Sequence, residues 1–178
     1  MAGDPSNASI WADADVYVGP TDATNPEDAD TEFGPDWDLV GLLSGDAGFV
    51  ESREEDSEDH FAWGGILVRT TRRNFKMTKT FTALENNDVT RELIWPGSPA
   101  GKLVVPRPKR IKIAFETREG NRIRRLISAF EAEVHVEGDI TDSEADLTEY
   151  EMVATIFPDT SESPAVLFIE QQTDTETS

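Results

Sequence analysis

Short segments in which apolar residues recur at every second position follow one another along most of this chain. The segment Ile10–Val18 has five such apolar positions, and residues 126–136 place Leu126, Phe130 and Val134 on one face opposite a row of glutamates. A period of two is typical of a β-strand with one buried face. Because Gly, Pro and polar turn residues separate the segments, the pattern favours an antiparallel sheet that buries a shared apolar face.

Further strands are predicted at residues 37–43, 61–68, 75–82, 111–115, 150–156 and 166–169. The pattern predicts one helix at about 87–95, in which Asn87 is the N-cap, with Pro96 and Gly97 after its end. The predicted fold class is mainly β: an antiparallel β-sandwich or partly closed barrel with one flanking α-helix.

The 178 residues suit a single domain, which we place at residues 10–170. Residues 1–9 and 171–178 are small or polar and are predicted to be flexible ends. Residues 44–60 are predicted to be an acidic loop, since Glu51–His60 holds six acids in ten residues. Residues 61–68 are apolar on both faces and predict a buried strand, which residues 70–74 would connect to the next one.

Charge is distributed in three blocks. Residues 1–60 carry 17 acids and one base, residues 61–125 carry 5 acids and 15 bases, and residues 126–178 carry 14 acids and no base, which gives −16 + 10 − 14 = −20. A chain this acidic is poorly suited to bind nucleic acid or an anionic membrane with its whole surface. Two interpretations stay open: the blocks neutralise one another within one subunit, or a basic face of one copy meets an acidic face of another.

No residue pattern predicts a catalytic, cofactor or metal site. The chain has no Cys, and neither His60 nor His135 stands near a motif that holds a nucleophile. Residues 28–39 resemble the start of a calcium loop, but the glycine is displaced and the twelfth position is Leu39. The basic segment 102–125 lacks the interleaved aromatic residues that stack on nucleic-acid bases. The three tryptophans that lie in apolar runs, at positions 37, 63 and 95, are predicted to pack in the core.

Residues Trp37–Ser98 carry a family resemblance. In order they hold a short strand, the turn GDAGF at 45–49, the acidic segment, AWGG at 62–65, a basic strand pair and a helix that ends in Trp95-Pro96-Gly97. This order resembles the major tail protein, or tail tube protein, of long-tailed non-contractile bacteriophages, especially those of actinobacterial hosts. Over residues 100–170 only the strand order and length agree.

The resemblance implies a structural virion protein with the phage tail tube fold. It implies that six subunits close into a ring, and that rings stack into the tube through which DNA is ejected into the host. The implied partners are further copies of the chain and the tape measure, tail terminator and distal tail proteins, with DNA passing without specific binding. The implied location is the virion, with assembly in the host cytoplasm, and no enzyme activity, cofactor or membrane is implied.

Two sets of charged residues are candidates for contacts in such a tube. Because the acidic segment and the nearest basic cluster would complement each other between stacked rings, the candidate ring-stacking residues are Glu51, Glu54, Glu55, Asp56, Glu58, Asp59, Arg69, Arg72, Arg73, Lys76 and Lys79. We expect the acidic segment to be mobile in the free subunit and ordered in the tube. Candidate lumen-facing residues, which would repel DNA, are Glu131, Glu133, Glu137, Glu149 and Glu151; the outside of the sandwich is the alternative position for them.

Two other classes of function stay open. One is a related ring or tube protein, such as a tail terminator or a type VI secretion tube subunit. Observing long polymers as opposed to single rings would separate these proteins from a tail tube. The other is a soluble acidic enzyme, which would require a pocket where two or more carboxylates converge.

Overall fold

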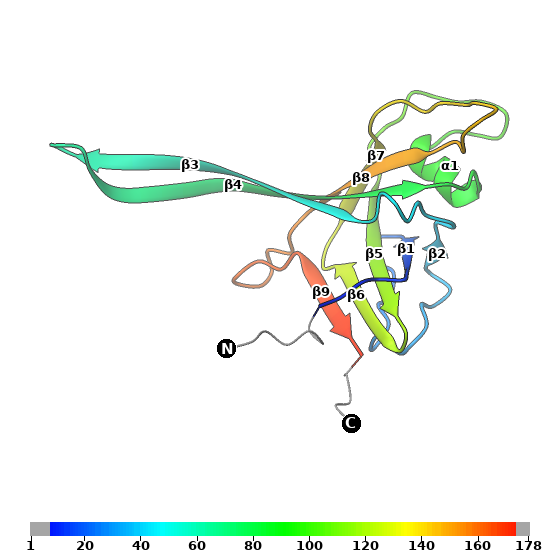
Figure 1. Ribbon diagram of the computed structural model, residues 1–178, viewed down its shortest axis with the longest axis horizontal. Helices are drawn as coiled ribbons and strands as arrows, with labels where there is room; N and C mark the ends of the chain where they lie inside the picture. Colours follow the sequence, from blue (N-terminus) through cyan, green and yellow to red (C-terminus); the bar gives the residue numbers. More distant parts are fainter. Residues whose placement is uncertain (1–7, 174–178) are drawn as a thin grey trace.

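The computed structural model describes residues 8–173. Within them the chain forms nine strands and one helix, and every strand pairing is antiparallel. The elements are β1 (Asp13–Gly19), β2 (Asp38–Leu39), β3 (Val50–Ala62), β4 (Ile66–Ala83), α1 (Asp88–Ile94), β5 (Arg110–Glu119), β6 (Arg122–Ser128), β7 (Ala132–Val136), β8 (Tyr150–Ile156) and β9 (Phe168–Gln172). The predicted mainly-β class with one flanking helix is confirmed (Figure 1).

Two sheets share strand β5. The first has the order β2-β1-β5-β6-β9, and the second runs β5-β7-β8-β4-β3. Strand β5 pairs with β7 through Arg110 and Ile111, and with β6 through Ala114–Glu119. The sheets therefore join along one strand and face each other without closing into a barrel.

The core lies between the two inner faces and follows from the alternation in the strands. Val16, Phe81, Ile113, Phe115 and Met152 are almost completely buried there. The ring of Phe115 stands edge-on to that of Phe81, with 6.0 Å between the ring centres, an arrangement that aromatic pairs favour. Apolar positions two residues apart thus supply the hydrophobic contacts that hold the two sheets together.

Helix α1 lies within one residue of its predicted bounds at each end. The side chain of Asn87 caps it, because Asn87 Oδ1 accepts a hydrogen bond of 2.9 Å from the Thr90 amide. Asn87 Nδ2 also donates to the Val40 carbonyl at 2.8 Å, which ties the helix to the chain that follows β2. Leu93 and Ile94 are buried against the core.

A second, smaller core covers the outer face of the first sheet. The segment 20–37 crosses this face and buries Trp37 beside Ala114 and Ile127. Arg125 fastens the segment by donating to the carbonyl oxygens of Asp28, at 2.9 Å, and Thr31, at 2.6 Å. The segment has little apolar content, so its composition does not reveal that one arginine attaches it to the sheet.

The predicted strand at 126–136 is two strands. Residues 129–131 interrupt the pairing, and the chain passes there from the first sheet to the second. Phe130, predicted to face the core, is 47% exposed. Because the interruption removes a backbone partner for Ile113, its amide donates instead to the Ser128 hydroxyl at 3.0 Å.

The prediction of an acidic loop at 44–60 is wrong for residues 50–60. These residues form most of β3, which pairs with β4 in one long ribbon (Figure 1). Residues 70–74 are part of β4, and the connection lies at 63–65, where Gly64 and Gly65 have φ of 88° and 79°. An acidic block forms a strand here because a basic strand, and no apolar core, lies beside it.

The predicted flexible ends fall mostly outside the described residues. Residues 1–7 and 174–178 are not described, so the prediction for them has no outcome here. Residues 171 and 172, predicted to belong to the flexible C-terminal end, are the last two residues of β9, which pairs with β6.

Candidate assembly surface

The most conspicuous surface of the molecule is a two-stranded arm, which we define as residues 53–76. Strand β8 pairs with β4 only over Met77–Ala83, so the ribbon beyond Arg53 and Met77 has no third strand. Nine residue steps along β3, from Arg53 to Ala62, give the arm a length of about 30 Å at about 3.3 Å per residue. Figure 1 shows it projecting away from the two sheets.

The arm is electrically neutral. It carries five acids (Glu54, Glu55, Asp56, Glu58 and Asp59) and five bases (Arg53, Arg69, Arg72, Arg73 and Lys76), so 5 − 5 = 0. The rest of the chain, with 31 acids and 11 bases, therefore carries the whole net charge of −20. The acids all lie on β3 and four of the five bases on β4, so the strands neutralise each other.

Several candidate stacking residues are partners within this one hairpin. Glu54 lies 3.8 Å from Lys76, and Glu55 lies 3.7 Å from Arg72. Asp56 accepts a hydrogen bond of 2.8 Å from Asn74, whose φ of 57° coincides with a break in the strand register. Exposed ion pairs of this kind contribute only about 0–1 kcal/mol each, so they order the ribbon weakly. Glu58, Asp59, Arg69 and Arg73 are exposed on the same ribbon.

Lys79 and Glu51 lie apart from the other candidates, at the base of the arm. The Lys79 side chain is 8% exposed, and its Nζ atom is 3.6 Å from Glu51 and 5.3 Å from the centre of the Phe115 ring. Burial lowers the pKa of Lys79, and the charge of Glu51 opposes that shift. Lys79 is therefore a core-facing group, which corrects its assignment to an exposed cluster.

The tip of the arm, residues 61–68, is apolar and exposed. Trp63 is 100% exposed, and the side chains of Phe61, Ile66, Leu67 and Val68 are all more than half exposed. The predictions of a buried strand at 61–68 and of a core position for Trp63 are both wrong. The signal that could have corrected them is the Gly64-Gly65 pair, because two glycines within an apolar run are typical of a hairpin turn.

The candidate lumen residues fall into two groups. Glu133 lies 2.9 Å from Arg110, and Glu131 lies 3.8 Å from the same guanidinium group, so both are ion-paired within the subunit. Glu137, Glu149 and Glu151 are exposed, and none has a salt bridge to a base among residues 8–173. Strand register places Glu133 and Glu151 on the face of the second sheet that points away from the core.

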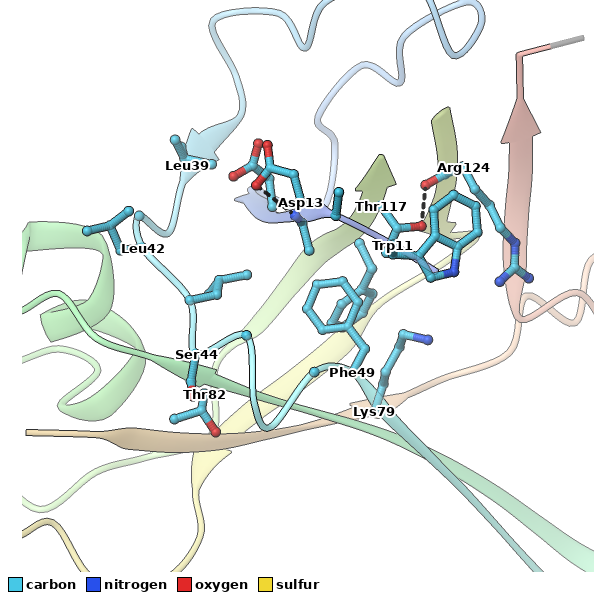
Figure 2. A pocket seen from close by; sticks show the side chains of 18 of the residues that line it. Trp11, Asp13, Leu39, Leu42, Ser44, Phe49, Lys79, Thr82, Thr117 and Arg124 are labelled. Carbon is cyan, nitrogen blue, oxygen red and sulfur yellow. Dashed lines mark hydrogen bonds between the residues drawn. The ribbon is translucent and has the colours of Figure 1, made fainter. Parts of the chain in front are cut away.

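An open cavity of about 610 Å³ separates the inner faces of the two sheets beside the base of the arm, and we call it the open seam. Its wall includes Phe49, Phe115 and Leu126, and Leu42 stands at its rim. Figure 2 shows Lys79 and Arg124 on the side of the cavity where Trp11 lies. Two smaller cavities, of about 530 and 390 Å³, lie on the side of α1.

The histidines and the calcium-like segment hold no assembled site in the described part of the chain. His60 Nε2 is 3.1 Å from the Thr71 hydroxyl on the exposed arm, and His135 is exposed on β7. The Asp28 carboxylate accepts three hydrogen bonds from Asp30 and Thr31, which close a local turn. Among residues 8–173, no three His, Asp or Glu side chains are grouped so that they could hold a metal ion, and no helix is long and apolar enough to cross a membrane.

Comparison with known proteins does not assign the chain to a family. No protein-family model matches the sequence, and no curated protein matches it significantly.

Proposed function

We propose that the protein is a structural subunit that assembles into rings and then into the tail tube of a long-tailed bacteriophage. The observation that carries the proposal is the arm: about 30 Å of two-stranded ribbon that ends in a fully exposed tryptophan. A two-stranded ribbon is at best marginally stable by itself, and an apolar tip in water is costly. Contact with further copies would stabilise both features.

The distribution of charge suits repeated contact between identical subunits. Bodies that each carry about −20 repel one another. The neutral arm can approach such a body without that penalty, and its tip can contribute apolar contacts. Exposed charge pairs between rings, which remain a prediction for Glu54, Glu55, Arg72 and Arg73, would add specificity more than affinity.

Passage of DNA is compatible with the acidic body. A channel through which a polyanion slides should bind few phosphates, because each phosphate neutralised by a base strengthens binding through counterion release. Glu137, Glu149 and Glu151, which are exposed and form no salt bridge within residues 8–173, could face such a channel. In this proposal the tape measure, tail terminator and distal tail proteins are the other partners, and the virion is the location.

The test is negative-stain electron microscopy of the purified protein beside an arm-shortened variant, in which an Asn-Gly turn replaces residues 54–76. The full chain should form rings or tubes with a central channel at high concentration. The shortened variant should stay monomeric and keep the cooperative thermal unfolding of a folded protein, with β-sheet circular dichroism reduced only by the strand residues removed. Long tubes would favour a tail tube over a terminator ring. A full chain that remains monomeric at every concentration, or a shortened variant that forms the same tubes, would contradict the proposal.

A further inference from the structure

Both long edges of the arm lack a strand partner in the single subunit. Within residues 8–173, β3 pairs only with β4, and β8 covers the other side of β4 only over Met77–Ala83. The backbone groups that point outward from residues 53–62 and 66–76 therefore have no neighbouring strand in this part of the chain. Unpaired strand edges of this length readily add a further strand, and the arm presents two of them.

The two edges carry opposite charges. The β3 part of the arm holds five acids and one base, and the β4 part holds four bases and no acid. Charged residues usually protect an edge because strands of like charge repel each other. In this arm the repulsion opposes pairing of β3 with β3 and of β4 with β4, but pairing of β3 with β4 brings opposite charges together. The charges therefore select one kind of partner.

Four charged residues of the arm have no ion-pair partner in their own hairpin. Glu58, Asp59, Arg69 and Arg73 form no salt bridge within the described part of the chain. The two acids lie opposite threonines in the hairpin register, and Asp59 accepts a hydrogen bond of 2.7 Å from the threonine hydroxyl opposite it. The same register places Glu58, Arg69 and Arg73 on one face of the ribbon. A neighbouring arm can therefore bring acids beside bases that no salt bridge already occupies.

We propose that β3 in the arm of one copy pairs, edge to edge, with β4 in the arm of a second copy. This inference rests on the proposed self-assembly and names the contact that joins neighbouring subunits. Because β3 and β4 are antiparallel, arms that lie side by side and point the same way form one continuous antiparallel sheet. The two surfaces in contact differ, so the row of arms keeps one free β3 edge and one free β4 edge until a ring closes.

Strand β8 limits where this pairing can begin. It occupies the outer side of β4 from Met77 onward, so the incoming β3 can pair only with residues 66–76. The incoming arm is therefore displaced toward the tip of the first. A repeated displacement of this kind tilts the strands relative to the axis of a closed sheet, and closure of a sheet requires such a tilt. The pairing is thus compatible with a ring.

Charge reversal on one edge at a time tests the pairing. One variant carries Glu58→Lys and Asp59→Lys on β3, and the other carries Arg69→Glu and Arg73→Glu on β4. Each variant alone places like charges at every junction between arms, so assembly should require a protein concentration at least about tenfold higher than the wild type needs. An equal mixture restores opposite charges at every junction, and it should assemble near the wild-type concentration with the two variants alternating.

The matched control reverses two acids outside the arm. Glu144→Lys and Asp146→Lys lie in the exposed segment between β7 and β8 and change the net charge as much as the β3 variant does. This control should assemble like the wild type, and all variants should keep the wild-type circular dichroism spectrum. Assembly of either arm variant alone as readily as the wild type, or a mixture that does not recover assembly, would overturn the proposal.

Amide hydrogen exchange separates strand pairing from contact between side chains alone. In the free subunit the amides that point outward from residues 53–62 and 66–76 should exchange quickly, and in the assembly they should be protected by hydrogen bonds to the neighbouring arm. If these amides exchange equally fast in both states although the mixture recovers assembly, side-chain charges join the arms without strand pairing. That result would overturn the inference.

Electron microscopy of the same samples separates this inference from the proposed function. Wild-type tubes without recovery in the mixture would overturn the edge pairing and leave the tube intact. Recovery in the mixture as open ribbons without a central channel, with the outward amides protected, would support the edge pairing and contradict the tube.

Discussion

Arg125 and Glu116 form an ion pair that is almost closed to solvent, with side chains 6% and 3% exposed. Glu116 also accepts a hydrogen bond from Arg118, which in turn binds Asp13 at 2.7 Å and Asp15 at 2.6 Å. The network lies on the outer face of the first sheet, beneath the segment that Arg125 fastens through two carbonyl groups. The network therefore helps to hold residues 20–37 in an ordered position on the sheet.

Removing one partner of this pair should be costly. We expect Arg125→Met to lower the free energy of unfolding by about 3–5 kcal/mol, because it leaves a buried carboxylate short of a partner and two carbonyl groups without a donor. Urea denaturation measures the change. Arg124→Met on the same strand is the matched control, and loss of its exposed pair with Glu170 should cost at most about 1 kcal/mol. Equal effects of the two variants would contradict the role of the network.

Replacing Lys79 should not destabilise the subunit. Because burial lowers its pKa, holding Lys79 charged opposes folding at neutral pH, and Lys79→Met should leave the free energy of unfolding unchanged or raise it by about 1–4 kcal/mol. Glu51 keeps Arg53 as a partner at 2.6 Å. The exposed Lys76→Met is the control and should change stability by less than about 0.5 kcal/mol.

The lowered pKa of Lys79 also makes the free energy of unfolding depend on pH in a direction that can be predicted. Between the lowered pKa of folded Lys79 and its ordinary value of 10.5, the unfolded chain binds more protons than the folded chain. The wild type should therefore gain stability relative to Lys79→Met as the pH rises through that window. Denaturation of both proteins at pH 7 and pH 10 checks this, and a difference that stays constant with pH would contradict it.

Mixing wild-type and charge-swapped copies tests whether the charged residues of the arm pair within one subunit or between subunits. A variant with all four changes, Glu54→Lys, Lys76→Glu, Glu55→Arg and Arg72→Glu, exchanges the two members of each pair and keeps opposite charges within its own hairpin. If the pairs at 3.7 and 3.8 Å act within each arm, wild-type and swapped copies should co-assemble into mixed tubes, visible by two-colour labelling. If these charges pair between rings, mixed stacking places like charges together, and the two proteins should sort into separate tubes.

The cap of α1 should carry a measurable share of stability. Asn87→Ala removes an N-cap and the bond to the Val40 carbonyl, and should cost about 1–2 kcal/mol in thermal or urea unfolding. Asn87→Ser keeps an N-cap acceptor but cannot reproduce the second bond, so it should recover only part of the loss. Full recovery by serine would show that the Val40 contact contributes nothing.

Local pattern predicted the elements whose partners are simple. β1 and β8 follow from the alternation of apolar residues, and Asn87 predicts the start of α1 correctly. The break at 129–131 was missed because apolar alternation continues through it, and only the transfer of the chain between sheets reveals it. The network around Glu116 was missed because its members are far apart in sequence.

The arm was missed for a different reason. An acidic block usually stays solvated as a loop, and that rule assumes that a strand needs an apolar core on at least one face. In β3 the stabilising partner is the basic strand β4, and only the pairing of the two shows it. Most of the candidate stacking residues lie close together within one hairpin, and the sequence alone does not distinguish pairing within a subunit from pairing between subunits.

The arm also sets the distance between two subunits that it joins. Because a paired β-ribbon resists stretching far more than a flexible chain does, the number of residues between Arg53 and the tip determines how far apart two bodies joined through it can lie. Two residues added to each strand would lengthen the arm by about 7 Å while preserving which side chains share a face. The axial repeat of an assembly built on such contacts would then be encoded in the length of one hairpin, and would change in discrete steps of a residue pair.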